Sequence, residues 1–222
     1  MKKPAFTAKD WEKLINDGSN YAGMGDQWSA EQKTLFECIK DRKVLKVQDA
    51  YAFSRQGKKE ENHAVNLARL IADFEPMEKV TGLIITHNDL TPEALQILID
   101  SPFIKDINYV QLGSNELGDE GVRILAQCEK FKNMHTLSLE CNNIGPEGAK
   151  SLAASPFVTN LNYLSLVDNR VGDEGALAIA NAEALSQLTY LHLGGNRIRS
   201  DATKQRVRES PKLANLKMLK IF

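Results

Sequence analysis

Apolar residues recur in one fixed arrangement between residues 80 and 222, with a period of 27 residues. Each copy has apolar residues at positions one, four, six and eleven and an asparagine at position nine. The copies begin at Val80, Ile107, Met134, Leu161 and Leu188. Because side chains alternate along an extended segment, positions four and six predict a short strand with one buried side. Positions three, five and seven of the same strand then face outward.

A helix is predicted after each strand. Residues 118–121, 145–148 and 172–175 read Gly-Asp-Glu-Gly, Gly-Pro-Glu-Gly and Gly-Asp-Glu-Gly in the same register. Acidic residues are favoured in the first helical turn, and proline is tolerated there. Apolar residues then return at Leu98, Leu125, Leu152 and Ile179, one to each repeat, and would face the strands.

The repeated arrangement of apolar residues and asparagine matches the pattern L-x-x-L-x-L-x-x-N-x-L of a leucine-rich repeat. The repeat length and the Gly-Asp/Pro-Glu-Gly helix start resemble the ribonuclease-inhibitor-like class, over residues 80–222 closely and over residues 42–79 weakly. That resemblance implies an α/β fold, a right-handed curved solenoid with a parallel sheet on the concave face and helices on the convex face. It also implies a protein-binding scaffold rather than an enzyme. The short regular array further resembles leucine-rich repeat effectors of intracellular bacterial pathogens.

The two ends depart from the repeat. Residues 1–41 are predicted to form a helical cap over the open end, including a helix from Ser29 that points Ile39 inward. Residues 42–222 form the solenoid, and its first repeat is degenerate with a charged insertion at residues 52–62. The last strand has no cap of its own, so its edge is predicted to be exposed.

The recurring asparagines are predicted to have a structural role. They are Asn88, Asn115, Asn142, Asn169 and Asn196. An asparagine amide both donates and accepts hydrogen bonds, so it can pair with backbone groups exposed by the turn after a strand. Stacked repeats would arrange these side chains as a ladder.

The outward strand positions are the candidate site, because they have no part in the core. Position three holds Tyr109, Thr136, Tyr163 and Tyr190, position five holds Gln111 and His192, and charge nearby comes from Glu140, Asp168, Arg170 and Arg197. Neighbouring strands lie about 4.8 Å apart, so Tyr163 and Tyr190 should be adjacent. Tyrosine is enriched at interface hot spots, although it also suits any exposed β-surface, and both explanations stay open.

Composition and charge argue against several classes of protein function. With 28 basic and 29 acidic residues and a net charge of −1, the chain lacks the footprint of a nucleic-acid-binding protein. No apolar run is long enough for a membrane span, and Pro4 and Asp10 interrupt any signal-peptide core. Three widely spaced cysteines indicate neither a disulfide framework nor a zinc site. We therefore expect a cytoplasmic protein without cofactor or metal, and delivery into a host cell by a specialised secretion system stays open.

Catalysis is not predicted. Cys141 and His192 lie two repeats apart, about 10 Å, which is too far for a nucleophile and its base. Cys141 is expected to be semi-buried beside the asparagines. Two classes remain: a module that binds and regulates or inhibits another protein through its concave face, and a scaffold that assembles through its terminal edge. The chain would be a monomer or a weak oligomer through that edge.

Overall fold

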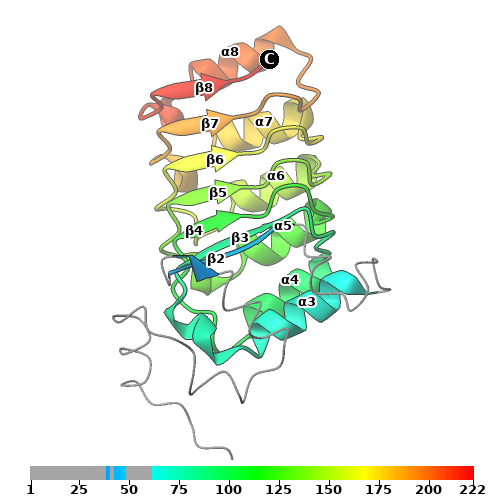
Figure 1. The fold of residues 1–222 in the computed structure, drawn as a ribbon. Helices are drawn as coiled ribbons and strands as arrows, with labels where there is room; N and C mark the ends of the chain where they lie inside the picture. The colour runs from blue at the N-terminus through cyan, green and yellow to red at the C-terminus, as the bar shows by residue number, and fades with distance from the viewer. Residues whose placement is uncertain (1–38, 41–42, 49–61) are drawn as a thin grey trace, which may run out of the picture.

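One sheet runs the length of the molecule in the computed structural model, which describes residues 39–40, 43–48 and 62–222 (Figure 1). Its strands, in both chain and spatial order, are β1 (Ile39–Lys40), β2 (Val44–Gln48), β3 (Gly82–Thr86), β4 (Tyr109–Gln111), β5 (Thr136–Ser138), β6 (Tyr163–Ser165), β7 (Tyr190–His192) and β8 (Met218–Lys220). β1 pairs antiparallel with β2, and every later pair is parallel.

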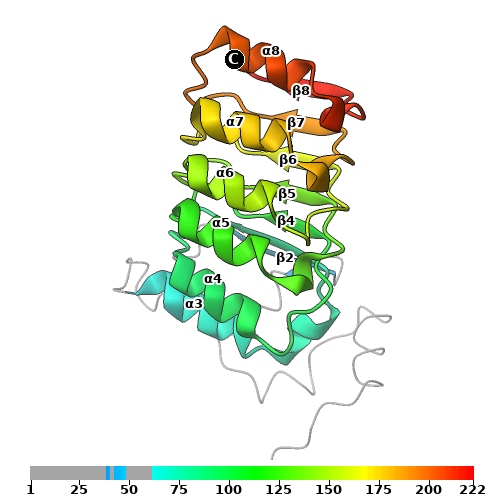
Figure 2. The same cartoon turned by 180° about the vertical axis from the view of Figure 1, so that it is seen from behind.

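Helices cover one face of this sheet, as the rear view shows (Figure 2). The α-helices are α3 (His63–Ala72), α4 (Pro92–Asp100), α5 (Gly118–Ala126), α6 (Pro146–Ala153), α7 (Gly172–Ala180) and α8 (Asp201–Arg208). Short 3-10 helices lead back to the sheet, at Glu75–Lys79 (η3), Glu129–Phe131 (η4), Glu183–Leu185 (η5) and Pro211–Leu213 (η6). We call the two sides of the molecule the strand face and the helix face.

The core consists of the residues that the repeat pattern predicts. Successive strands pair without any shift, so Leu83 lies beside Val110 and Leu164 beside Leu191. The apolar positions one, four, six and eleven are buried in all five copies. Leu45 pairs with Leu83, so β2 continues the parallel sheet in register before the first regular copy of the repeat. The predicted α/β solenoid is confirmed.

The position of the first strand, β1, shows that one prediction was wrong. Ile39 was expected in a helix of the cap, but it lies in β1 opposite Leu45. The exposed edge of β2 offers unpaired backbone groups, and a short antiparallel return satisfies some of them. The rest of the predicted cap in residues 1–41 lies outside the described residues. So does the predicted insertion 52–62, apart from Asn62.

The asparagines at position nine link consecutive repeats. Asn142 is fully buried, and its Nδ2 donates to the Leu112 carbonyl at 2.8 Å and to the Glu140 carbonyl at 2.9 Å. Asn169 repeats the arrangement one turn on, because its Oδ1 accepts from the backbone N–H groups of Asn142 and Ile144, both at 2.9 Å. Each asparagine therefore pairs backbone groups of its own repeat with those of the preceding one.

Two kinds of turn alternate along the stack. Position eight is left-handed in all five copies. The first, third and fifth copies add a left-handed residue at position ten, at Asp89, Asn143 and Arg197. The second and fourth instead use a left-handed glycine at position twelve, Gly118 or Gly172. Neighbouring repeats therefore turn differently, and alternate repeats turn alike.

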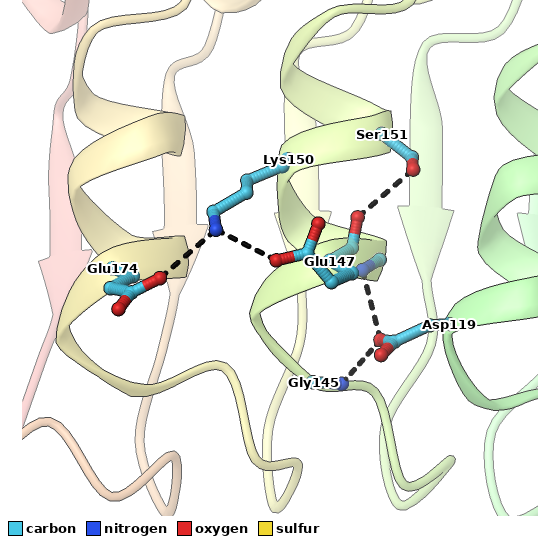
Figure 3. Close-up of polar contacts among 7 residues, drawn as sticks. Asp119, Gly145, Glu147, Lys150, Ser151 and Glu174 are labelled. Atoms are coloured by element: carbon cyan, nitrogen blue, oxygen red, sulfur yellow. Dashed lines mark hydrogen bonds and ion pairs between the residues drawn. The ribbon is translucent and has the colours of Figure 1, made fainter.

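The helix face shows the same alternation. In α5, Asp119 Oδ1 accepts from the backbone N–H groups of Gly145 at 2.6 Å and Gly148 at 2.9 Å, so it caps the start of α6 (Figure 3). Asp173 in α7 likewise accepts from the backbone N–H of Ser200 before α8. In α6, Pro146 occupies the equivalent place and offers no such acceptor.

Candidate protein-binding face

Two tyrosine rings stack against each other on the strand face. Tyr163 on β6 pairs in register with Tyr190 on β7, and their rings stack with centroids 4.3 Å apart and planes 6° apart. Burial, followed by the charge and hydrogen bond of Tyr190, raises the pKa of Tyr163 to about 12. Stacking at adjacent outward positions restricts both side chains, so the strand face presents a preformed aromatic surface.

The C-terminal side of this stack is lined by residues of the last two strands. His192 contacts Tyr190 edge to face, with ring centroids 6.3 Å apart, and lies 5.8 Å from the ring of Phe222. Phe222 covers Gly194, where an added Cβ would lie 2.7 Å from the Phe222 ring. Lys220 Nζ lies 6.0 Å from the Tyr190 centroid. The outer side of Tyr190 therefore already has a cation beside it.

This arrangement favours the neutral form of His192. Burial and then the charge of Lys220 lower the pKa of His192, whereas Glu140 and Asp168 act weakly in the opposite direction. Its Nε2 atom is buried and has no hydrogen-bond partner among the described residues. A neutral imidazole packed against Phe222 contributes shape and apolar area rather than charge.

Two carboxylates lie near the stack, Glu140 on its β5 side and Asp168 against the following repeat. Glu140 Oε1 accepts a hydrogen bond of 2.8 Å from the Ser165 hydroxyl. Asp168 occupies a left-handed turn position and lies against Gly195, where an added Cβ would come within 2.0 Å of Asp168 Oδ1. Within the described part of the chain, neither carboxylate makes an ion pair with a basic side chain. Both remain available to a partner.

Small residues lie between these groups. Ser138 and Ser165 point to the strand face, yet they are only 6% and 0% exposed. They are beside one another on β5 and β6, with Gln111 on one flank and His192 on the other. Their burial shows that the larger neighbouring side chains lean over them and form a continuous surface.

The structure brings some of the predicted site residues together and leaves others apart. Tyr109, Thr136, Tyr163 and Tyr190 follow one another across β4 to β7. Arg170 and Arg197 are exposed at position ten, after the turn that ends each strand. No hydrogen bond or ion pair joins their side chains to the other predicted site residues in the described ranges.

Sequence reasoning missed three contributors to this face: Ser165, Lys220 and Phe222. The first two occupy position five and Phe222 occupies position seven, so strand alternation alone placed them outward. Phe222 was instead assigned to the exposed edge of the sheet. It is 75% exposed, but its ring also folds against His192.

No chemical centre is evident in the described residues. Cys141 was expected to be semi-buried, but it is exposed, at a left-handed turn position. Burial, and then Asp168 and Glu140, raise the pKa of the Cys141 thiol, which is opposite to the activation of a nucleophilic cysteine. Among those residues, no group of three or more His, Cys, Asp or Glu side chains could hold a metal ion. In the same part of the chain, no helix is long and apolar enough to cross a membrane.

Comparison with known proteins agrees with the repeat architecture. Residues 106–126, 132–153 and 159–180 each match the protein-family model described as Leucine Rich repeat. With the in-register strands and the buried repeat positions, this makes the chain a leucine-rich repeat protein. Protein interaction is the general use of such solenoid surfaces.

Solved structures with similar folds are distant. The tropomodulin C-terminal domain of Caenorhabditis elegans is 21% identical, with a TM-score of 0.48, and the match covers 66% of this chain and 88% of that one. An internalin from Listeria monocytogenes is 21% identical, with a TM-score of 0.47, over 68% of this chain and 38% of that one. The actin-binding site 2 of leiomodin-1 is 10% identical, with a TM-score of 0.43, over 83% and 86%. A search of curated proteins finds no match.

Proposed function

We propose that this chain is a non-catalytic module that binds another protein through its strand face. The observation that carries the proposal is the stacked, half-buried Tyr163–Tyr190 pair on β6 and β7 of that face. Tyrosine contributes a large apolar area with few rotatable bonds, and rings already held in place lose little freedom on binding. A partner seated there has part of its own surface covered, so inhibition or regulation of that partner is the mode of action we favour.

The rest of the face supports recognition of a specific surface. Gln111 and Thr136 supply neutral polar groups, while Glu140 and Asp168 provide charge at the border. Charges at an interface border act mainly on orientation and on the rate of association. The cytoplasmic location and the resemblance to bacterial effectors stay predictions, to be tested by fractionating cells that produce the tagged protein.

The test begins by identifying the partner. A photo-crosslinking amino acid is placed at Gln111 on the strand face in one protein and at Glu174 on the helix face in another. The partner should be captured through the first position and not the second. It is then purified and titrated calorimetrically against Tyr163→Ala, Tyr190→Ala and the helix-face control Lys150→Ala.

Each tyrosine variant should weaken binding about thirtyfold, because truncating a central aromatic residue typically costs about 2 kcal/mol or more. Lys150→Ala should change affinity less than about twofold, since its ion pairs with Glu147 and Glu174 are exposed surface contacts. Folding of each variant is checked by circular dichroism. Normal binding by both tyrosine variants would place the interface elsewhere.

A second function, assembly through the β8 edge, has its own observation. β8 lies at the end of the described sheet, and Met218 beside it is 48% exposed. Unpaired strand edges can add a further strand. Light scattering across a concentration series tests this alternative: a mass that rises with concentration, and falls again in Met218→Lys, would favour assembly.

A further inference from the structure

The strand face contains a gap in its row of tyrosines. On β5 the place of a tyrosine is taken by Thr136, which pairs in register with Tyr109 on one side and Tyr163 on the other. The two tyrosine backbones are thus two strand spacings apart, about 9.6 Å. Stacked groups need about 3.5–4.0 Å on each side, so there is room for one inserted planar group and not for two.

The walls of this gap differ from those of the neighbouring pair. One face of the Tyr163 ring is already used by Tyr190, at 4.3 Å. Lys220 lies beside Tyr190, on β8 beyond the stack. The free face of Tyr163 is therefore the one toward β5, and Thr136 is too short to cover it.

Charge at the gap is negative. Glu140 follows Thr136 and Ser138 along the same outward row and reaches toward β6, where it accepts from Ser165. Asp168 follows β6 at its carboxyl end, but its carboxylate lies against Gly195 of the next repeat, away from the gap. Neither carboxylate is paired with a cation within the described residues, and the basic group that contacts the stack, Lys220, is on its far side.

We infer that the gap over Thr136, between Tyr109 and Tyr163, receives an arginine side chain of the partner, whose guanidinium pairs with Glu140. This inference rests on the proposed function and names its chemistry. Guanidinium is planar, stacks on tyrosine and makes forked hydrogen bonds to a carboxylate, whereas the lysine ammonium does neither as well. An acidic or phosphorylated segment would meet the uncompensated Glu140 carboxylate.

The test uses short peptides in place of the unidentified partner. Acetyl-Gly-Gly-X-Gly-Gly amides, in which X is arginine, lysine, citrulline or glutamate, are titrated into the isotope-labelled full chain and followed by amide chemical shifts. Citrulline keeps the shape of arginine without its charge. The arginine peptide should bind most tightly, with shifts concentrated on β4, β5 and β6, and about tenfold more tightly than citrulline, given the strength of charge-assisted hydrogen bonds.

Variants connect the binding to the named side chains. Glu140→Gln and Tyr163→Ala should each weaken the arginine peptide about fivefold or more, whereas Glu147→Gln, a matched change on the helix face, should not. Equal binding of citrulline and arginine, preference for glutamate, or no detectable binding of any peptide would overturn the arginine assignment. The proposed function fails separately, by normal partner binding in Tyr163→Ala and Tyr190→Ala.

Discussion

Replacing Asn142 with alanine should lower the free energy of unfolding by about 3 kcal/mol. The side chain is fully buried. It donates to the carbonyls of Leu112 and Glu140 at 2.8 and 2.9 Å and accepts from the backbone N–H of Leu117 at 3.3 Å. Each lost hydrogen bond costs about 1 kcal/mol, and three are removed. The Leu117 N–H is left unpaired, whereas the Leu112 and Glu140 carbonyls keep the Asn115 amide and the Ser114 N–H as donors. Water cannot easily replace them, because the neighbouring repeats enclose the site.

Urea unfolding followed by circular dichroism measures the effect, with Asn181→Ala as the matched control. Asn181 is an exposed residue at the end of α7, so its replacement should change stability by less than about 0.5 kcal/mol. Asn142→Asp provides a sharper comparison. It preserves shape but turns an acceptor toward two carbonyls and buries a charge, so it should destabilise more than alanine at neutral pH. An Asn142→Ala midpoint equal to that of the wild type, with an unchanged slope, would refute the reasoning.

Three further predictions follow from named contacts. Asp119→Ala removes the acceptor 2.9 Å from the Gly148 nitrogen and should cost about 1 kcal/mol, seen as a Tm lower by a few degrees; an unchanged Tm would show that the cap contributes nothing. Gly175→Ala places a Cβ 2.9 Å from that of Ala149 and should cost about 1–3 kcal/mol in urea unfolding, unless α6 and α7 separate freely. The raised pKa of Tyr163, about 12 against about 10 when unfolded, contributes stability that is lost as pH rises from about 10 to about 12. Tyr163→Phe should therefore lose less stability than the wild type across that interval, and parallel losses would contradict this.

The fold was largely predictable because the 27-residue period shows which positions of each repeat are buried. One 27-residue phrase assigns the buried and outward strand positions, and in-phase copies also imply an unshifted strand register. That register alone predicts that Tyr163 and Tyr190 are neighbours. The ring stack does not, since its 4.3 Å separation depends on side-chain rotamers chosen in the packed face.

Other features required the structure for physical reasons. The antiparallel strand at Ile39 depends on pairing with β2, and local pattern instead favoured a helix. Cys141 is exposed at a left-handed turn position, and neither property follows from its residue type. The turn alternation was visible in sequence, where Pro92, Asp119, Pro146 and Asp173 succeed one another, but its meaning appears only when Asp119 is seen to cap the next helix.

The alternating turns give this solenoid a translational unit of two repeats rather than one. Gly118 and Gly172 mark equivalent points of that unit, twice 27 residues apart. Removing a single repeat would join two turns of the same kind, and removing the repeat that carries Asp119 would also take away the acceptor at the start of α6. Removing a pair would preserve the order of turns at the new junction. A chain shortened by two repeats should therefore lose less stability at its junction than one shortened by a single repeat.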